Sequence, residues 1–351
     1  MFQNLPDYIL VDNEDTRLNL LPMTYTRPVS GLRVGITTIR EKWERLKGAP
    51  AAVRTVDYLS EKFPCNAAEG AEEIDSATVP GIGRIENLWD IFMLNGRAIV
   101  ADFEAITQGR ESAPLSRTNT VVGDPSLIFL EEGAVVEGAF LNTTHGPIYV
   151  GAHAEIMEGA ALRGPVALCE HAVVNMGAKI YPGTTIGPWC KVGGELNNVV
   201  MQGYSNKAHD GFLGNAVIGE WCNIGAGCTA SNLKNDYTEI KLWNYPAQRF
   251  LRTGLQFCGV IMGDHSKCGI NTMLNTATVL GVGVNIHGSG FPRPFVASFS
   301  ESGGAGYVDV SMTKFFDIAS RMMARRGIEL SDADRRIFHA VREFAQQFLF
   351  L

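Results

Sequence analysis

The middle of the chain reads Val150-Gly-Ala-His-Ala-Glu-Ile156-Met-Glu-Gly-Ala-Ala-Leu162, with an aliphatic side chain at every sixth residue. This period matches neither the 3.6-residue repeat of a helix nor the two-residue alternation of a strand. The same spacing continues through Leu168, Val174, Ile180, Ile186 and Val192. Hexapeptide repeats are typical of a triangular coil, in which three repeats make one turn and stacked turns share one apolar column.

A second set of small or apolar residues follows the first set at a distance of four positions. Its members are Ala154, Ala160, Val166, Ala172, Ala178, Thr184, Cys190 and Leu196. Both inward positions of each short strand are therefore filled, and glycines such as Gly159 and Gly177 fall at corners, where the missing Cβ permits tight turns. The pattern predicts a mainly β fold, a left-handed parallel β-helix.

The repeat breaks after Val192, resumes at Ile218 and Ile224, and returns in phase from Met262 to Ile286. We therefore expect the coil to span 119–300, with two insertions near 196–217 and 229–260 that leave it. Residues 1–118 have the mixed patterning of a small α/β domain, including a helix-like stretch from Thr38 to Lys47. Residues 311–351 form a helical tail, whose first helix ends at Gly327 and whose second begins at Ser331.

Composition excludes several classes of protein. The 351 residues include 30 basic and 37 acidic side chains, for a net charge of −7, and no basic stripe that would favour nucleic acid. The chain has no run of 18 apolar residues and no secretory leader, so we expect a cytoplasmic protein without membrane insertion. Seven cysteines without a CxxC pair predict buried thiols, with neither a disulfide framework nor a metal site.

Two polar clusters interrupt the apolar repeat and are candidates for chemistry. The first runs from Gln202 to Gly214 and contains Tyr204, Lys207 and a single histidine, His209. Loops on a rigid scaffold often carry catalytic groups, so His209 is either a catalytic base or a structural histidine, and Lys207 could meet a sugar phosphate. The second cluster supplies an amide and two cations, which suit a phosphorylated sugar or any polar loop equally: Asn232, Lys234 and Lys241.

Three amino-terminal arginines could bind nucleotide phosphates, because one guanidinium group can donate hydrogen bonds to two phosphate oxygens at once: Arg17, Arg27 and Arg33. The alternative, which we favour, is that they lie on a solvated or domain-contact surface. No glycine-rich phosphate loop is present, since the first apolar run is followed by Asp12-Asn-Glu-Asp-Thr-Arg.

The segment Ser205-Asn-Lys-Ala-His-Asp-Gly-Phe-Leu-Gly-Asn, followed by Ile218-Gly-Glu-Trp-Cys-Asn-Ile-Gly-Ala-Gly and then Asn232, carries a resemblance to a known family. It resembles the acetyltransferase half of bifunctional glucosamine-1-phosphate N-acetyltransferase/N-acetylglucosamine-1-phosphate uridylyltransferases. The stretch Leu20-Leu-Pro-Met-Thr-Tyr-Thr-Arg-Pro-Val also looks like sugar nucleotidyltransferases of the alternative bacterial type.

The resemblance implies roles for particular residues. His209 would accept the proton of the sugar amine, Asn232 would contact the amino sugar, and Lys241 matches a downstream lysine. It also implies a homotrimer that binds acetyl-CoA in the groove between neighbouring prisms. Phe212 stands where the family commonly has tyrosine, so one hydroxyl is missing from the sugar pocket.

We therefore expect an acetyl-CoA-dependent N-acetyltransferase that acts on a phosphorylated amino sugar, with glucosamine-1-phosphate as the first candidate, in nucleotide-sugar or cell-envelope precursor synthesis. The missing glycine loop predicts that uridylyl transfer is weak or absent, and Mg²⁺ is required only if that activity is retained. The alternatives are a UTP-dependent sugar-1-phosphate nucleotidyltransferase and a non-catalytic trimeric module that binds a sugar nucleotide. A metal-dependent hydratase is a further alternative, although the histidines lack the close spacing of a single-chain zinc site.

Overall fold

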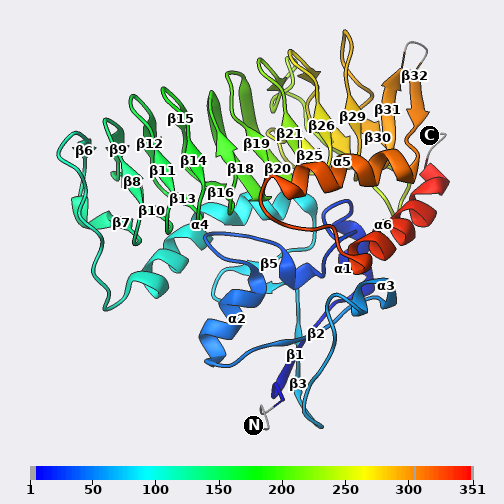
Figure 1. Ribbon diagram of the computed structural model, residues 1–351, viewed down its shortest axis with the longest axis horizontal. Helices are drawn as coiled ribbons and strands as arrows, with labels where there is room; N and C mark the ends of the chain where they lie inside the picture. Colours follow the sequence, from blue (N-terminus) through cyan, green and yellow to red (C-terminus); the bar gives the residue numbers. More distant parts are fainter. Residues whose placement is uncertain (1–4, 304–305, 349–351) are drawn as a thin grey trace.

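The computed structural model describes residues 5–303 and 306–348. A parallel β-helix runs along the long axis of the molecule, the amino-terminal domain lies beside it, and two carboxy-terminal helices lie next to both (Figure 1). The mainly β coil predicted from the six-residue period is confirmed. No helix within the described ranges has the length and apolar composition needed to cross a membrane.

One turn of the coil takes 18 residues, as shown by the parallel pairing of Ile148 with Val166 and of Val166 with Thr184. Each inward side chain therefore stacks on its equivalent in the turn before. The aliphatic set from Val150 to Val192 is at most 2% exposed at all of its eight positions. The apolar column is thus continuous, and no single repeat could bury its own share.

Three faces make up the coil. The first face contains β7 (Ile128–Leu130), β10 (Ile148–Val150), β13 (Val166–Leu168), β16 (Thr184–Ile186), the ends of β18 (Glu195–Gly203) and β20 (Phe212–Glu220), β25 (Ile261–Met262), β28 (Val279–Leu280) and β30 (Phe295–Val296). The second contains β8 (Val135–Val136), β11 (Glu155–Ile156), β14 (Val173–Val174), β17 (Lys191–Val192), β19 (Asn206–Lys207), β21 (Asn223–Ile224), β26 (Lys267–Cys268), β29 (Asn285–Ile286), β31 (Ser300–Gly303) and β32 (Gly306–Asp309). The third contains β6 (Thr120–Val122), β9 (Phe140–Asn142), β12 (Ala161–Arg163), β15 (Lys179–Ile180), the starts of β18 and β20, β22 (Thr229–Ala230) and β27 (Met273–Leu274).

The prediction that residues 196–217 leave the coil is wrong. Strands β18 and β20 pair in parallel from Glu195 with Phe212 to Gly203 with Glu220, so this segment forms a turn of 17 residues, one fewer than the 18 that separate β10 from β13. The repeat is hidden in the sequence because Lys207 takes the inward position of the second face, where it pairs with Val192 of the turn before. A polar residue broke the hydrophobic pattern without breaking the backbone ladder.

A true excursion follows β22 and returns to the coil at β25. It contains the antiparallel hairpin of β23 (Lys241–Asn244) and β24 (Arg249–Arg252). The hairpin packs against the coil because the ring of Trp243 stacks on Phe295, with ring centroids 4.3 Å apart.

The amino-terminal domain has a parallel sheet in the order β2 (Ala52–Arg54), β1 (Tyr8–Val11), β3 (Glu72–Asp75). Around it lie α1 (Glu14–Asn19), η1 (Val29–Gly31), α2 (Ile39–Lys47), α3 (Asp57–Ser60), β4 (Thr78–Val79) and β5 (Gly83–Arg84). Helix α2 confirms the predicted helix, and Thr38 and Glu41 close its first turn as a capping box.

Helix α4 (Leu88–Thr107), which the sequence analysis did not predict, joins this domain to the coil. It contacts β16, β18 and β20 on the first face. The Asn95 side chain is fully buried there and donates to the carbonyl oxygen of Gly183 at 2.7 Å and to the Thr185 hydroxyl at 3.0 Å. The amino-terminal domain therefore covers the first face.

The two helices predicted for the tail are confirmed. Helix α5 (Met312–Ala324) begins after Ser311, and α6 (Asp332–Ala345) begins after Ser331, which forms a capping box with Asp334. In Figure 1, α5 crosses the second half of the coil, and α6 lies beside α3 of the amino-terminal domain. Three segments distant in sequence thus meet along one side of the coil.

Candidate functional site

His209 lies on an exposed corner of the coil, in the loop between β19 and β20. Two side chains hold the backbone of this loop: Asn175 Nδ2 donates to the Ala208 carbonyl oxygen at 2.8 Å, and the Lys207 ammonium donates to the carbonyls of His209 and Asp210. The Gly227 N–H also donates to the Asp210 carbonyl, at 2.9 Å. The backbone is therefore fixed while the imidazole stays open to solvent.

The Lys207 side chain does not reach the surface beside His209, contrary to the expectation that it meets a sugar phosphate. Its side chain is fully buried inside the coil, and burial lowers the pKa of the Lys207 ammonium. Its distance to the Asp210 carbonyl oxygen is 3.0 Å. An inward lysine in an apolar column satisfies these carbonyls from within, so it positions the His209 loop.

Glycine is required where neighbouring turns approach this loop. A Cβ on Gly193 would lie 2.3 Å from the carbonyl oxygen of Ala208. A Cβ on Gly211, whose φ is +122°, would lie 2.0 Å from the carbonyl oxygen of Cys228. The corner around His209 is therefore closely packed at the backbone, which fixes the place of the imidazole.

Asn232 lies near the start of β20, on the face that begins just after the His209 loop. Its Nδ2 donates to Asn215 Oδ1 at 2.8 Å. A Cβ on Gly214 would meet both Asn232 Nδ2 at 2.5 Å and the Phe212 ring at 2.6 Å, so these two side chains flank the same glycine. An amide and an aromatic ring therefore lie together, and the aromatic residue, Phe212, begins β20 three residues after His209.

The remaining residues predicted for the sugar site are placed differently. Lys234 Nζ donates to the Glu239 carbonyl at 3.0 Å within its own loop. Lys241 is exposed at the start of β23. Tyr204 lies at another corner of the coil, between the first and second faces, where its ring stacks on Trp221 with centroids 4.3 Å apart. The structure thus brings Asn232, but not Tyr204, toward the His209 corner.

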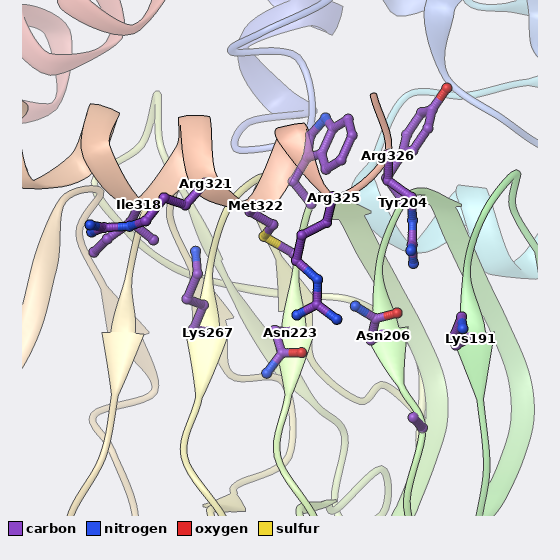
Figure 2. Close-up of a pocket in the computed structure, with 12 residues that line it drawn as sticks. Lys191, Tyr204, Asn206, Asn223, Lys267, Ile318, Arg321, Met322, Arg325 and Arg326 are labelled. Atoms are coloured by element: carbon purple, nitrogen blue, oxygen red, sulfur yellow. The ribbon is translucent and has the colours of Figure 1, made fainter. Parts of the chain in front are cut away.

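A groove of about 530 Å³, which was not predicted from the sequence, lies between the second face and α5 (Figure 2). Ala208 lines it, so the groove reaches the residue before His209. The polar residues in its wall are Lys191, Asn206, Asn223, Lys267, Arg321, Arg325 and Arg326. The four that belong to the coil each precede an inward residue of a second-face strand, and this recurring outward polar position was the available signal.

Comparison with known proteins finds one family model and several curated relatives. A family model described as sugar nucleotidyl transferase matches residues 8–83. The bifunctional protein GlmU of Alkaliphilus metalliredigens is 27% identical over 188 residues, which cover 46% of this chain and 41% of that protein. The resemblance to the GlmU-like bifunctional family is confirmed.

A bifunctional sugar-1-phosphate nucleotidylyltransferase/acetyltransferase of Sulfurisphaera tokodaii is 28% identical over 145 residues, or 40% of this chain and 35% of that protein. The chain spans less than half the length of these curated relatives. Among solved structures, the polysialic acid O-acetyltransferase OatWY is 12% identical and covers 55% of this chain and 85% of its own, with a TM-score of 0.22. That score is too low to support inferences about function.

The amino-terminal arginines are buried and contact other residues of the chain. Arg27 Nη2 lies 2.6 Å from Asp264 Oδ2 and 3.2 Å from Glu220 Oε2, both on the coil. Burial acts to lower the pKa of Arg27, but the two carboxylates outweigh it and raise that pKa. Arg33 donates to the carbonyl oxygens of Ile36 and Gln202, and the favoured alternative of a domain contact is confirmed for Arg27 and Arg33.

Arg17 is also buried, and its Nη1 lies 3.3 Å from the Tyr58 hydroxyl. Beside it, the carboxylate of Asp12 accepts hydrogen bonds from the hydroxyls of Ser76 and Thr55, both at 2.6 Å, and from the Val29 N–H at 3.1 Å. Asp12 follows β1, its hydroxyl partners follow β2 and β3, and Val29 begins η1, so together they close the carboxyl edge of the sheet, where open parallel sheets bind ligands. Burial raises the pKa of Asp12.

In residues 5–303 and 306–348, no group of three or more histidine, cysteine, aspartate or glutamate side chains is placed to hold a metal ion. Six of the seven cysteines are buried, and Cys65 is exposed. Near this corner of the coil, the described polar groups that could take part in chemistry include the exposed imidazole of His209 and the Asn232 amide, which contacts Asn215.

Proposed function

We propose that this protein is an acetyl-CoA-dependent N-acetyltransferase that acts on a phosphorylated amino sugar, with glucosamine-1-phosphate as the first candidate. The observation that carries the proposal is the exposed imidazole of His209, on a loop that the buried Lys207 holds in place. The proposal includes a cytoplasmic homotrimer that serves nucleotide-sugar or cell-envelope precursor synthesis, by analogy with the family it resembles.

His209 would act as the general base. The neutral sugar amine attacks the thioester carbonyl carbon, and the imidazole accepts the ammonium proton as the new N–C bond forms. The tetrahedral intermediate then collapses, the C–S bond breaks, and the proton passes to the leaving thiolate. We take the transfer to be direct, and burial supports this for Cys222, because it raises the pKa of that thiol to about 12 and keeps it in the un-nucleophilic form.

Asn232 and Phe212 would shape the sugar pocket. The amide of Asn232 can donate to and accept from sugar hydroxyls once it turns from Asn215. Phe212 offers an apolar face without a hydroxyl, so the sugar loses one hydrogen bond, worth about 0.5–1.5 kcal/mol. This difference affects which amino sugar is preferred, since related amino sugars can differ in the orientation of a single hydroxyl group.

The test follows free thiol release from acetyl-CoA with glucosamine-1-phosphate, glucosamine-6-phosphate and galactosamine-1-phosphate as acceptors. We expect turnover with at least one of them and a loss of about 10²–10⁴-fold in His209→Ala, the usual contribution of a positioned base. His145→Ala is the matched control, because His145 is also an exposed histidine of the coil. Equal turnover in both variants would remove His209 from the mechanism.

Nucleotidyl transfer is the second candidate, because the sugar nucleotidyl transferase model matches residues 8–83. The internal bonds of Asp12, Arg27 and Arg33 weigh against it, since the groups that could hold phosphates already have protein partners. We expect no pyrophosphate release from UTP and Mg²⁺ with sugar-1-phosphates. Release that depends on Arg17 would restore this candidate, and ligand binding without any turnover would favour the non-catalytic module.

A further inference from the structure

The groove between the second face and α5 is strongly cationic. Five basic side chains line it, and no aspartate or glutamate does: Lys191, Lys267, Arg321, Arg325 and Arg326. Within the described chain, none of the five lies within 4.0 Å of a carboxylate. Such a cluster is unexpected in a chain of net charge −7 and marks the groove as a site for an anion.

The cations come from two separate elements that face each other. Figure 2 shows Arg325 directed from the end of α5 toward Asn206 and Asn223 on the coil, and Lys267 directed from the coil toward α5. A helix carboxyl end by itself favours basic residues, through its dipole, and this would account for Arg325 and Arg326. It does not account for Lys191 and Lys267, which stand on the opposite wall.

Aromatic rings also line this groove. Tyr204 and Trp221 line it and are stacked on each other with an interplanar angle of 10°. Both residues have a positive φ, 54° and 59°, which places them at a sharp corner of the coil. Next to them, the Arg326 guanidinium lies 5.8 Å from the ring centroid of Trp189. Flat rings beside guanidinium groups suit a ligand that combines a base with phosphates.

We propose that this groove binds a nucleotide carrying at least two phosphates, and that it does so within one chain. The phosphates lie between Arg321 and Arg325 on one side and Lys191 and Lys267 on the other, and the base lies toward Tyr204. Binding at this site does not depend on the proposed acetyl transfer. The resemblance, by contrast, implies a donor held between neighbouring prisms.

Two ligands share this chemistry, a coenzyme A and a sugar nucleotide. The groove ends at Ala208, next to His209, so a nucleotide with a reactive arm along the second face would reach the candidate base. A sugar nucleotide would instead place its sugar there. The experiment must therefore compare the two.

Isothermal titration of the full chain with coenzyme A, ADP, UDP-N-acetylglucosamine and UDP tests the proposal. We expect at least one of these to bind, and we expect Arg321→Gln/Arg325→Gln to weaken that binding by about 100-fold or more, since the loss of one hydrogen bond to a charged group weakens binding by about tenfold or more and this variant removes two such donors. Arg249→Gln on the exposed hairpin is the matched control. Coenzyme A and ADP binding alone would identify an acyl donor, and UDP-N-acetylglucosamine and UDP binding alone a sugar nucleotide.

Three controls keep the outcomes distinct. His209→Ala should bind the nucleotide as the unaltered protein does, so loss of turnover with retained binding separates the groove from the base. Arg325→Gln alone serves if the double variant unfolds at a lower temperature. The proposal is overturned if none of the four nucleotides binds at millimolar concentration, or if binding is equal in the arginine variants and the Arg249→Gln control.

Discussion

Replacing Arg27 tests how the amino-terminal domain is held on the coil. Arg27 is 5% exposed and Asp264 is 4% exposed, and the two are joined at 2.6 Å. In Arg27→Met the side-chain stem is retained, but Asp264 keeps only the Thr26 hydroxyl at 2.5 Å and the Glu220 N–H at 2.8 Å as donors. A buried carboxylate without its cation destabilises a protein by about 3–5 kcal/mol, and this is the loss we expect.

The assay is urea unfolding of the variants, with hydrogen exchange of residues 20–36 as a local measure. Arg27→Met/Asp264→Asn should recover at least about 1 kcal/mol of the loss, because the neutral amide removes the uncompensated charge. Arg40→Met is the control, since the Arg40 side chain is 42% exposed and pairs with Glu44 on the same helix, where a change within about 0.5 kcal/mol is expected. If Arg27→Met were as stable as this control but no longer bound UTP, Arg27 would be a phosphate ligand and the docking interpretation would fail.

Three further outcomes follow from buried groups. Burial holds the pKa of His265 well below its usual value, so the unfolded chain binds a proton at a higher pH than the folded chain does. The free energy of unfolding should therefore fall by about 1.4 kcal/mol per pH unit below pH 6.5. Urea unfolding of His265→Phe should lack this pH dependence. Lys207→Met should lower kcat by about tenfold or more with little change in the KM for the sugar phosphate, whereas a direct phosphate contact would mainly raise KM. Burial lowers the pKa of Lys267 to about 8, so nucleotide affinity measured by titration calorimetry should decline as pH rises from 7 to 9, and a flat profile would show that Lys267 does not contact the phosphates.

The parts of the fold that could be predicted from the sequence are those specified by a repeating residue pattern or by residues close together in the chain. The six-residue spacing from Val150 to Val192 specifies the coil because each repeat needs the same two inward side chains. Caps are equally local: Thr38, Ser311 and Ser331 each bond a backbone N–H three residues away, so the starts of α2, α5 and α6 were readable.

The same signals failed where a polar side chain takes an inward place. Lys207 looked like part of an insertion, although the ladder of β18 and β20 continues through that turn. Helix α4 was not predicted because polar residues such as Asn95 are buried only where the helix packs on the first face of the coil. Hydrophobic periodicity identifies the apolar residues of the core. It does not identify polar residues that are buried and form their hydrogen bonds within the protein.

The sequence by itself determined the repeat, the helix caps and the His209 and Asn232 motif, because each is written in residues close together along the chain. Tertiary structure alone decided that Arg27 meets Asp264, 237 positions away, and that Lys191 and Lys267 face Arg321 and Arg325 across a groove. Charges act through space, so their partners are set by how the coil, the amino-terminal domain and α5 pack together.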